Sequence, residues 1–341
     1  MNESTEKTIK ADAALARSSR SSGAQAIRGL LVTREVGVLA ALMALCVFFS
    51  FASHVFLTST NILNLLRQIS LLGVLAVGAT YVLIISEVDL SVGSLYGFAG
   101  MVSGLLIVNN VPEIAAIVIT LFFGLAIGAL NGAITVAGRI PSFITTLGTL
   151  YLIRGATLVM SSGMPVSLPH GQGAAPIITY LAQGSLFGGL SNQVLVLIAI
   201  AAAGYFLLHK TTFGFHIFAI GGNDRAARIV GVPVVRTKII AFALAGVLAA
   251  FAGVINFGFL ENVQPVTGMG LELDVIAAVI IGGTRLGGGE GSIPGTLLGV
   301  LLIGVVRDGL ILLGVTPFWQ TTLIGAVVLA ASLIGGLTSR K

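Results

Sequence analysis

The sequence predicts an all-α membrane protein with about ten transmembrane helices. Of its 341 residues, 56% are hydrophobic and only 9% are charged, and the mean hydropathy is +1.04. A soluble domain does not need so much apolar surface, whereas each membrane helix needs about 20 mainly apolar residues. The 45 glycines agree with this fold class, because small residues let membrane helices approach one another closely.

Apolar segments long enough, or nearly long enough, to cross a bilayer follow a polar tail at 1–35. They form one transmembrane domain over 36–336, before a short tail at 337–341. The segments are 36–56, 65–86, 90–109, 113–136, 142–162, 192–209, 238–258, 273–284, 293–314 and 317–336. The segment at 273–284 is the shortest. Because the first segment begins far from residue 1, we expect no cleavable secretory signal.

The positions of lysine and arginine predict that both termini lie in the cytoplasm. With the N-terminus inside, the inner segments collect Arg139, Arg285, the basic C-terminus and the five cations of 210–238. On the outside only Arg67 lies near a span end, and the long loop 163–191 has no lysine or arginine. An even number of spans agrees, because it places both termini on one side.

The outer loop 163–191 is rich in glycine and proline, but it contains the apolar run Ile177–Leu181. This run is compatible with a short helix on the outer surface, where a delivery protein could sit. His170 has no second metal-ligand type of residue near it, so the loop predicts no metal site.

The basic loop 210–237 carries a short helix with both ends marked. Asn223 can accept a hydrogen bond from a free backbone N–H, which starts a helix at Asp224. Gly231 can close the helix after Val230, and Pro233 prevents its continuation. Since two turns are not stable alone in water, the helix needs a surface to pack against. It is either part of a basic loop on the lipid headgroups or a docking helix for a partner.

Several stretches resemble the membrane subunits of ribose-type carbohydrate ABC importers. The run AIGGNDRAARIVGV at 219–232 is similar to the coupling-loop region of that family. The stretch SEVDLSVGS at 86–94 resembles a GGIDLSVGS-like signature, but Ser86 and Glu87 stand where glycines are usual. ELDVIAA at 272–278 and IIGGTRLGGGEGSIPGTLLG at 280–299 also match. The resemblance covers about residues 58–336.

This resemblance implies the permease fold of an ABC importer in the cytoplasmic (inner) membrane. It implies an ATP-binding subunit at the cytoplasmic face, a second permease copy as a homodimer, and an extracytoplasmic sugar-binding protein. The chain would move a pentose, hexose or sugar alcohol by alternating access. The expected docking helix comprises Gly222, Asn223, Asp224, Ala226, Ala227, Arg228 and Gly231.

The chain itself is not expected to be an enzyme or to hold a cofactor. It has no G-x-x-x-x-G-K-[ST] sequence, so ATP is expected on the separate subunit. A stand-alone secondary transporter of a small polar solute is the alternative, and a membrane-embedded enzyme lacks a convergent catalytic group set. The net charge of +5 does not indicate nucleic acid, because no basic face with interleaved aromatic residues is present.

Two stretches, 84–97 and 280–295, each interrupt an apolar run with glycine, serine and a charge. They are compatible with the two related halves that transporters often have, or with two independent turns. In the first stretch, Asp89 can cap the following span, since negative charge is favourable at a helix N-terminus. Asp274 is expected to cap the span at 273–284 in the same way.

Charges inside the spans need partners, because an unpaired charge in a bilayer costs at least about 2.5 kcal/mol. Arg154 lies in the middle of a span, and we expect it to pair with Glu87, Asp89 or Asp274, or to contact a ligand. Arg307 and Asp308 are adjacent and therefore point to different sides of their helix.

Polar side chains within the spans have two interpretations. Asn131, Thr145 and Thr149 offer hydroxyl and amide groups that a sugar path needs, and we expect them to line that path. The same groups commonly form hydrogen bonds between helices. Glycines at intervals of four predict close helix packing, at Gly124, Gly128 and Gly132 and at Gly295 and Gly299.

Overall fold

The structure is a computed structural model, and it describes residues 34–168, 175–186 and 189–316, with positions 319, 322, 325 and 326. Residues 1–33 of the expected tail at 1–35, and the expected tail at 337–341, lie outside the described residues. So do His170 and most of the tenth expected span at 317–336.

The described part of the chain is a bundle of helices whose positions follow the expected spans closely. In chain order the spans correspond to α2 (Arg34–Ala52), α3 (Ser59–Ile84), α4 (Val92–Val108), α5 (Glu113–Gly138), α6 (Ser142–Met160), α8 (Asn192–His209), α11 (Val234–Leu260), α12 (Leu271–Ile281) and α13 (Ile293–Leu312). Among the described residues, α3, α5, α6, α8, α11 and α13 are long and apolar enough to cross a membrane. The total of ten spans stays a prediction.

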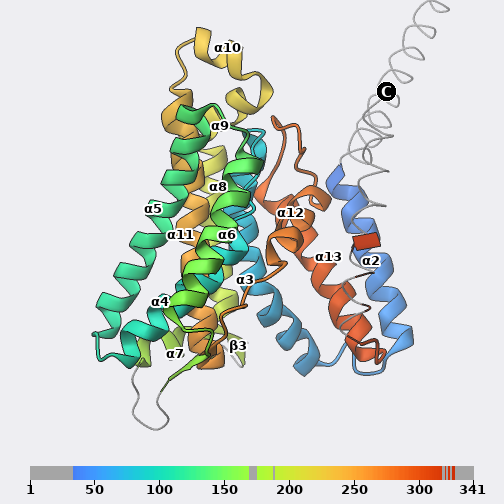
Figure 1. The fold of residues 1–341 in the computed structure, drawn as a ribbon. Coiled ribbons are helices and arrows are strands. Elements are labelled where there is room, and N and C mark those ends of the chain that lie inside the picture. The colour runs from blue at the N-terminus through green and yellow to red at the C-terminus, as the bar shows by residue number, and fades with distance from the viewer. Residues whose placement is uncertain are drawn as a thin grey trace, which may run out of the picture.

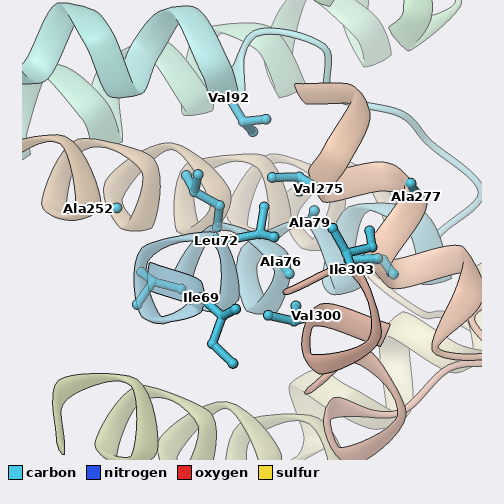
Figure 2. Packing of buried hydrophobic residues seen from close by; sticks show 14 of the residues in the cluster. Ile69, Leu72, Ala76, Ala79, Val92, Ala252, Val275, Ala277, Val300 and Ile303 are labelled. Atoms are coloured by element: carbon cyan, nitrogen blue, oxygen red, sulfur yellow. The ribbon is translucent and has the colours of Figure 1, made fainter. Parts of the chain in front are cut away.

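Helices α3 and α11 form the centre of this bundle (Figure 1). Helix α11 packs against α5, α4 and α3, and α3 also contacts α8, α12 and α13. Figure 2 shows one side of α3, whose Leu72 and Ala76 lie among Ala252 of α11, Val275 of α12 and Val300 of α13. Because aliphatic side chains of four helices meet here, the core fixes the helices that carry the polar sites.

Close packing of α5 on α11 follows the glycine strip that the sequence predicts. A Cβ at Gly124 would lie 2.7 Å from the carbonyl oxygen of Gly246, and one at Gly132 would lie 2.8 Å from Cα of Ile239. On α13, a Cβ at Gly299 would lie 2.0 Å from the carbonyl oxygen of Ala278 in α12, and one at Gly295 would lie 2.2 Å from that of Gly282 at the end of α12. The absence of side chains at these positions lets the backbones approach.

The expected short helix in the outer loop is present as α7 (Pro176–Gln183). The Glu113 carboxylate accepts hydrogen bonds from the N–H groups of Ile177 and Ile178, at 3.0 and 2.6 Å, and so caps α7 from α5. Two short antiparallel ribbons lie at this end: β1 (Val166–Ser167) with β4 (Asn262–Val263), and β2 (Ser185–Leu186) with β3 (Leu190–Ser191). This end is opposite α10 (Asp224–Ile229) in Figure 1.

The segment between α8 and α11 contains more helix than the sequence analysis expected. Helix α9 (Thr212–Gly222) precedes α10, and α11 begins at Val234 rather than at residue 238. Ile217 and Ile220 of α9 are buried against the bundle, so α9 forms the base on which α10 rests.

Candidate functional site

The capping signals around α10 are confirmed. The Asn223 side-chain oxygen accepts a hydrogen bond from the Ala226 N–H at 3.0 Å. Gly231 has a positive φ of 84°, and the Val232 N–H donates to the Ala227 carbonyl oxygen, which ends the helix. The helix is one residue shorter than expected, since it ends at Ile229. It projects from one end of the molecule, beyond the long helices (Figure 1).

The two faces of α10 differ in exposure. Ala227 is only 3% exposed, and it packs in a cluster with Ile217 of α9 and Val234 of α11. In contrast, Ile229 is 85% and Val230 is 77% exposed. Ala227 was expected among the docking residues, but it anchors α10 to the bundle. The free face consists of Arg225, Ala226, Arg228, Ile229 and Val230.

A shallow groove of about 790 Å³ lies beside this free face. Arg228 of α10 and Arg236 of α11 border it, and apolar side chains of 232–240 form its floor. The free face and the groove together offer apolar surface edged by positive charge.

Lys238 connects α10 to a distant part of the chain. Its ammonium group forms an ion pair with Glu87, and it lies 3.7 Å from an Asp224 oxygen at the start of α10. Asp224 also pairs with Arg228 one turn later, at 3.1 Å. Lys238 is largely buried at the start of α11.

The segment 87–91, between α3 and α4, is held by hydrogen bonds from α6. The Val88 N–H donates to the Ser142 hydroxyl at 3.0 Å, and the Leu90 N–H donates to the Thr146 hydroxyl at 3.1 Å. This fixes the direction in which the chain enters α4.

Asp89 does not cap α4 as expected. The N-cap residue of α4 is Ser91, and no side chain forms a capping hydrogen bond there. Asp89 instead accepts hydrogen bonds from the N–H and hydroxyl of Ser91, at 2.8 and 2.6 Å. Burial raises the pKa of the Asp89 carboxyl, and the two bonds from Ser91 oppose that effect.

Of the residues expected to line a path, Asn131 and Thr149 form hydrogen bonds between helices. The Asn131 amide donates to the Ser91 hydroxyl at 2.9 Å and accepts from the Thr149 hydroxyl at 2.6 Å. Asn131 is 1% exposed. Thr145 is buried, and its hydroxyl has no hydrogen-bond partner among the described residues. Path lining therefore stays a prediction.

Arg154 contacts none of the three acids that were expected as its partners. Its guanidinium donates to the carbonyl oxygens of Pro265 and Thr267, at 3.0 and 2.7 Å. The reason is that the loop between α11 and α12 turns in against the first turns of α4, where Thr267 lies against Gly97. α6 therefore presents Arg154 to that loop.

Glu272 was not singled out from the sequence as a charge near Arg154. It lies in the first turn of α12, close enough for its charge to act on Arg154. One of its oxygens is buried without a hydrogen-bond partner among the described residues. The sequence signal that could have identified Glu272 was an acidic residue in the first turn of a short helix.

Asp274 does not cap α12, whose N-cap is Gly270 without a side-chain bond. It pairs with Arg307 of α13 at 2.8 Å. Asp308 accepts a hydrogen bond from the Asn61 amide of α3 at 2.8 Å. Arg307 and Asp308 therefore do point to different partners, as their adjacency predicts.

The two similar stretches of the sequence lie against each other. The Ser86 hydroxyl donates to the Gly287 carbonyl oxygen at 2.6 Å, and the Gly289 N–H donates to the Ile84 carbonyl oxygen at 2.9 Å. The turn after α3 and the turn after α12 thus form one surface near the end of α9, where the Ser86 hydroxyl lies 3.4 Å from the Gly221 carbonyl oxygen.

A known protein family, described as "Branched-chain amino acid transport system / permease component", matches residues 61–332. The chain belongs to this permease family. Similar proteins include the "Ribose import permease protein RbsC" of Escherichia coli K12, 40% identical over 296 residues, which are 87% of this chain and 92% of that protein. The "Probable ABC transporter permease protein YphD" of the same organism is 36% identical over 307 residues, 90% and 91% of the two chains. The "Xylose transport system permease protein XylH", also from this organism, is 33% identical over 361 aligned positions, 89% and 92% of the two chains.

No solved structure matches this permease at a significant level. Membership in the family, together with the long apolar helices, makes the permease a multi-pass protein of the inner membrane. It also excludes the alternative of a stand-alone secondary transporter. Permeases of this kind are transport subunits rather than enzymes.

Proposed function

We propose that this permease is the translocation subunit of an ABC importer for a sugar. The observation that carries the proposal is α10, a capped two-turn helix whose inner face is anchored at Ala227 and whose outer face is free. Relatives named for ribose and xylose, at 40% and 33% identity, support a sugar rather than a branched-chain amino acid. A pentose, a hexose and a sugar alcohol all fit this reading.

The ATP-binding subunit would dock on the free face of α10. Ile229 and Val230 offer apolar contact area there, and Arg225 and Arg228 offer positive charge at its edge. The anchored inner face would make α10 move as one piece with the start of α11. ATP would bind on the partner subunit, and this chain would need no cofactor of its own.

The remaining partners complete the proposal. A second copy of the permease would enclose the sugar path with the first. A sugar-binding protein would dock at the opposite end, where Glu113 holds α7 in place. With ten spans and both termini in the cytoplasm, the transporter would work by alternating access.

Co-purification with the system's own ATP-binding subunit tests the docking site. We expect the unmodified permease to retain that subunit and the variant Ile229→Asp to lose it. Ile229→Asp places a charge on the exposed face, so it should not disturb membrane insertion. Leu286→Asp is the matched control, because Leu286 is an apolar residue in the exposed turn after α12, 56% exposed. This control should retain the ATP-binding subunit.

Retention of the ATP-binding subunit by Ile229→Asp at the unmodified level would overturn the docking site. Transport is tested with radiolabelled ribose and xylose in proteoliposomes that contain the complete complex. Uptake that continues without the ATP-binding subunit would refute the ABC mechanism.

A further inference from the structure

Glu87, between α3 and α4, has a specific partner for its side chain in the structure. The side chain is 14% exposed and forms an ion pair with the Lys238 ammonium, whose side chain is 11% exposed. Burying two charges is favourable only when they are well paired, so the Glu87 carboxylate and the Lys238 ammonium depend on each other.

Lys238 faces acids from two separate elements. Glu87 belongs to the segment before α4, whereas Asp224 belongs to the first turn of α10, and its Oδ2 lies 3.7 Å from the Lys238 Nζ. Arg228 shares Asp224 at 3.1 Å from the exposed side. One buried ammonium group therefore joins α10, the start of α11 and the segment 87–91.

Beyond Glu87 the contacts continue into the bundle without a break. Val88 and Leu90 donate to the hydroxyl groups of Ser142 and Thr146 on α6. Ser91 then accepts from Asn131 of α5. The route from Asp224 to the first turn of α4 thus runs through ion pairs and hydrogen bonds whose partners are mostly buried.

We propose that the Glu87–Lys238 ion pair transmits movement of α10 to the segment 87–91 and so to the start of α4. Glu87 and Lys238 are then positioning residues for transport, which act without touching the sugar. The inference rests on the proposed function, in which an ATP-binding subunit moves α10. A physical coupling route requires evidence that a change at one end alters the other.

Hydrogen–deuterium exchange on the complete complex supplies this evidence without knowledge of the sugar. Exchange is compared before and after trapping with ATP, Mg²⁺ and vanadate, in the unmodified permease and in the double variant Glu87→Gln with Lys238→Met. The double variant removes both charges together, so no unpaired buried charge is left to prevent folding. The two observed segments are 224–230, which reports docking, and 88–95, which reports transmission.

In the unmodified complex we expect trapping to change exchange in both segments. In the double variant the change at 224–230 should persist, whereas the change at 88–95 should fall roughly tenfold. The single variants Glu87→Gln and Lys238→Met should each lose about as much as the double variant, because they break the same link. Lys238→Arg keeps the positive charge and should retain most of the response.

A control removes an ion pair from the same end of the molecule. Arg285 and Glu290 pair at 2.7 Å within an exposed turn, and replacing both by glutamine should leave the response at 88–95 unchanged. An equal response at 88–95 in the unmodified permease and the double variant would overturn the inference, as would no response in either. If trapping leaves 224–230 unchanged in the unmodified complex, the docking proposal itself fails.

Discussion

Gly128 of α5 lies directly against the carbonyl oxygen of Phe242 in α11, so closely that a Cβ at Gly128 would overlap it. The Phe242 carbonyl oxygen and the Gly128 Cα are both backbone atoms, so neither helix could relieve the overlap by rotating a side chain. This contact lies in the middle of the strip that joins α5 to α11.

The variant Gly128→Val should therefore separate α5 from α11. Overpacking of a tight interior costs about 1–3 kcal/mol, so we expect a melting temperature several degrees lower for the permease in detergent. Gly148→Val is the matched control, because no atom lies within 4 Å of a Cβ added at Gly148 on α6. Equal melting temperatures for the two variants would contradict the close approach.

Removal of the Asn223 cap should loosen α10. Asn223→Ala leaves the Ala226 N–H without its partner, which costs about 1 kcal/mol of local helix stability. We expect faster amide exchange over 226–230 by roughly fivefold and weaker retention of the ATP-binding subunit. Asn223→Ser keeps a side-chain acceptor, so a loss as large as that of alanine would argue against capping.

Arg154 should control the loop between α11 and α12. Arg154→Met removes the donors to Pro265 and Thr267, and hydrogen bonds to charged groups contribute about 1.5–3 kcal/mol each. We expect faster amide exchange over 266–271 with little change in α7. Arg154→Lys retains one charged donor and should be intermediate. Unchanged exchange in the methionine variant would show that packing alone holds the loop.

The pair of Arg307 and Asp274 should stabilise the contact of α12 with α13. A double-mutant cycle with Arg307→Met and Asp274→Asn should give an interaction free energy of about 1 kcal/mol in thermal unfolding. Asp308→Asn serves as the reference, because Asp308 bonds Asn61 on α3 instead. The destabilisation by Asp308→Asn should add to that by Asp274→Asn. If the effects of Arg307→Met and Asp274→Asn are additive as well, the ion pair does not contribute to stability.

The sequence predicted the features that depend on local pattern. The apolar spans, the helix α7, the Asn223 cap and the positive φ of Gly231 follow from composition, capping chemistry and backbone freedom. The glycine strip of α5 was predictable for the same reason, since its interval of four places all three glycines on one face.

Features that depend on contacts between distant segments were not predictable. The partners of Arg154 are backbone carbonyl groups. Every residue type has such a group, so the sequence does not indicate where these partners lie. Asp274 had two possible roles, and only the position of α13 decides between cap and ion pair. Ala227 was assigned to docking because a small residue fits either a partner's groove or the helix's own base. Helix α9 was missed because residues 210–237 were interpreted as one basic loop, although the part at 212–222 is itself apolar.

The contact between the turns after α3 and α12 has a consequence for how the chain is made. Gly287, whose carbonyl oxygen accepts a hydrogen bond from the Ser86 hydroxyl, comes 201 residues after Ser86. A ribosome that feeds the chain into the bilayer from its N-terminus releases the first turn long before the second exists. The turn at 84–91 must therefore remain without this partner through the insertion of α4 to α12. Its final shape is among the last parts of the molecule to be set during biogenesis.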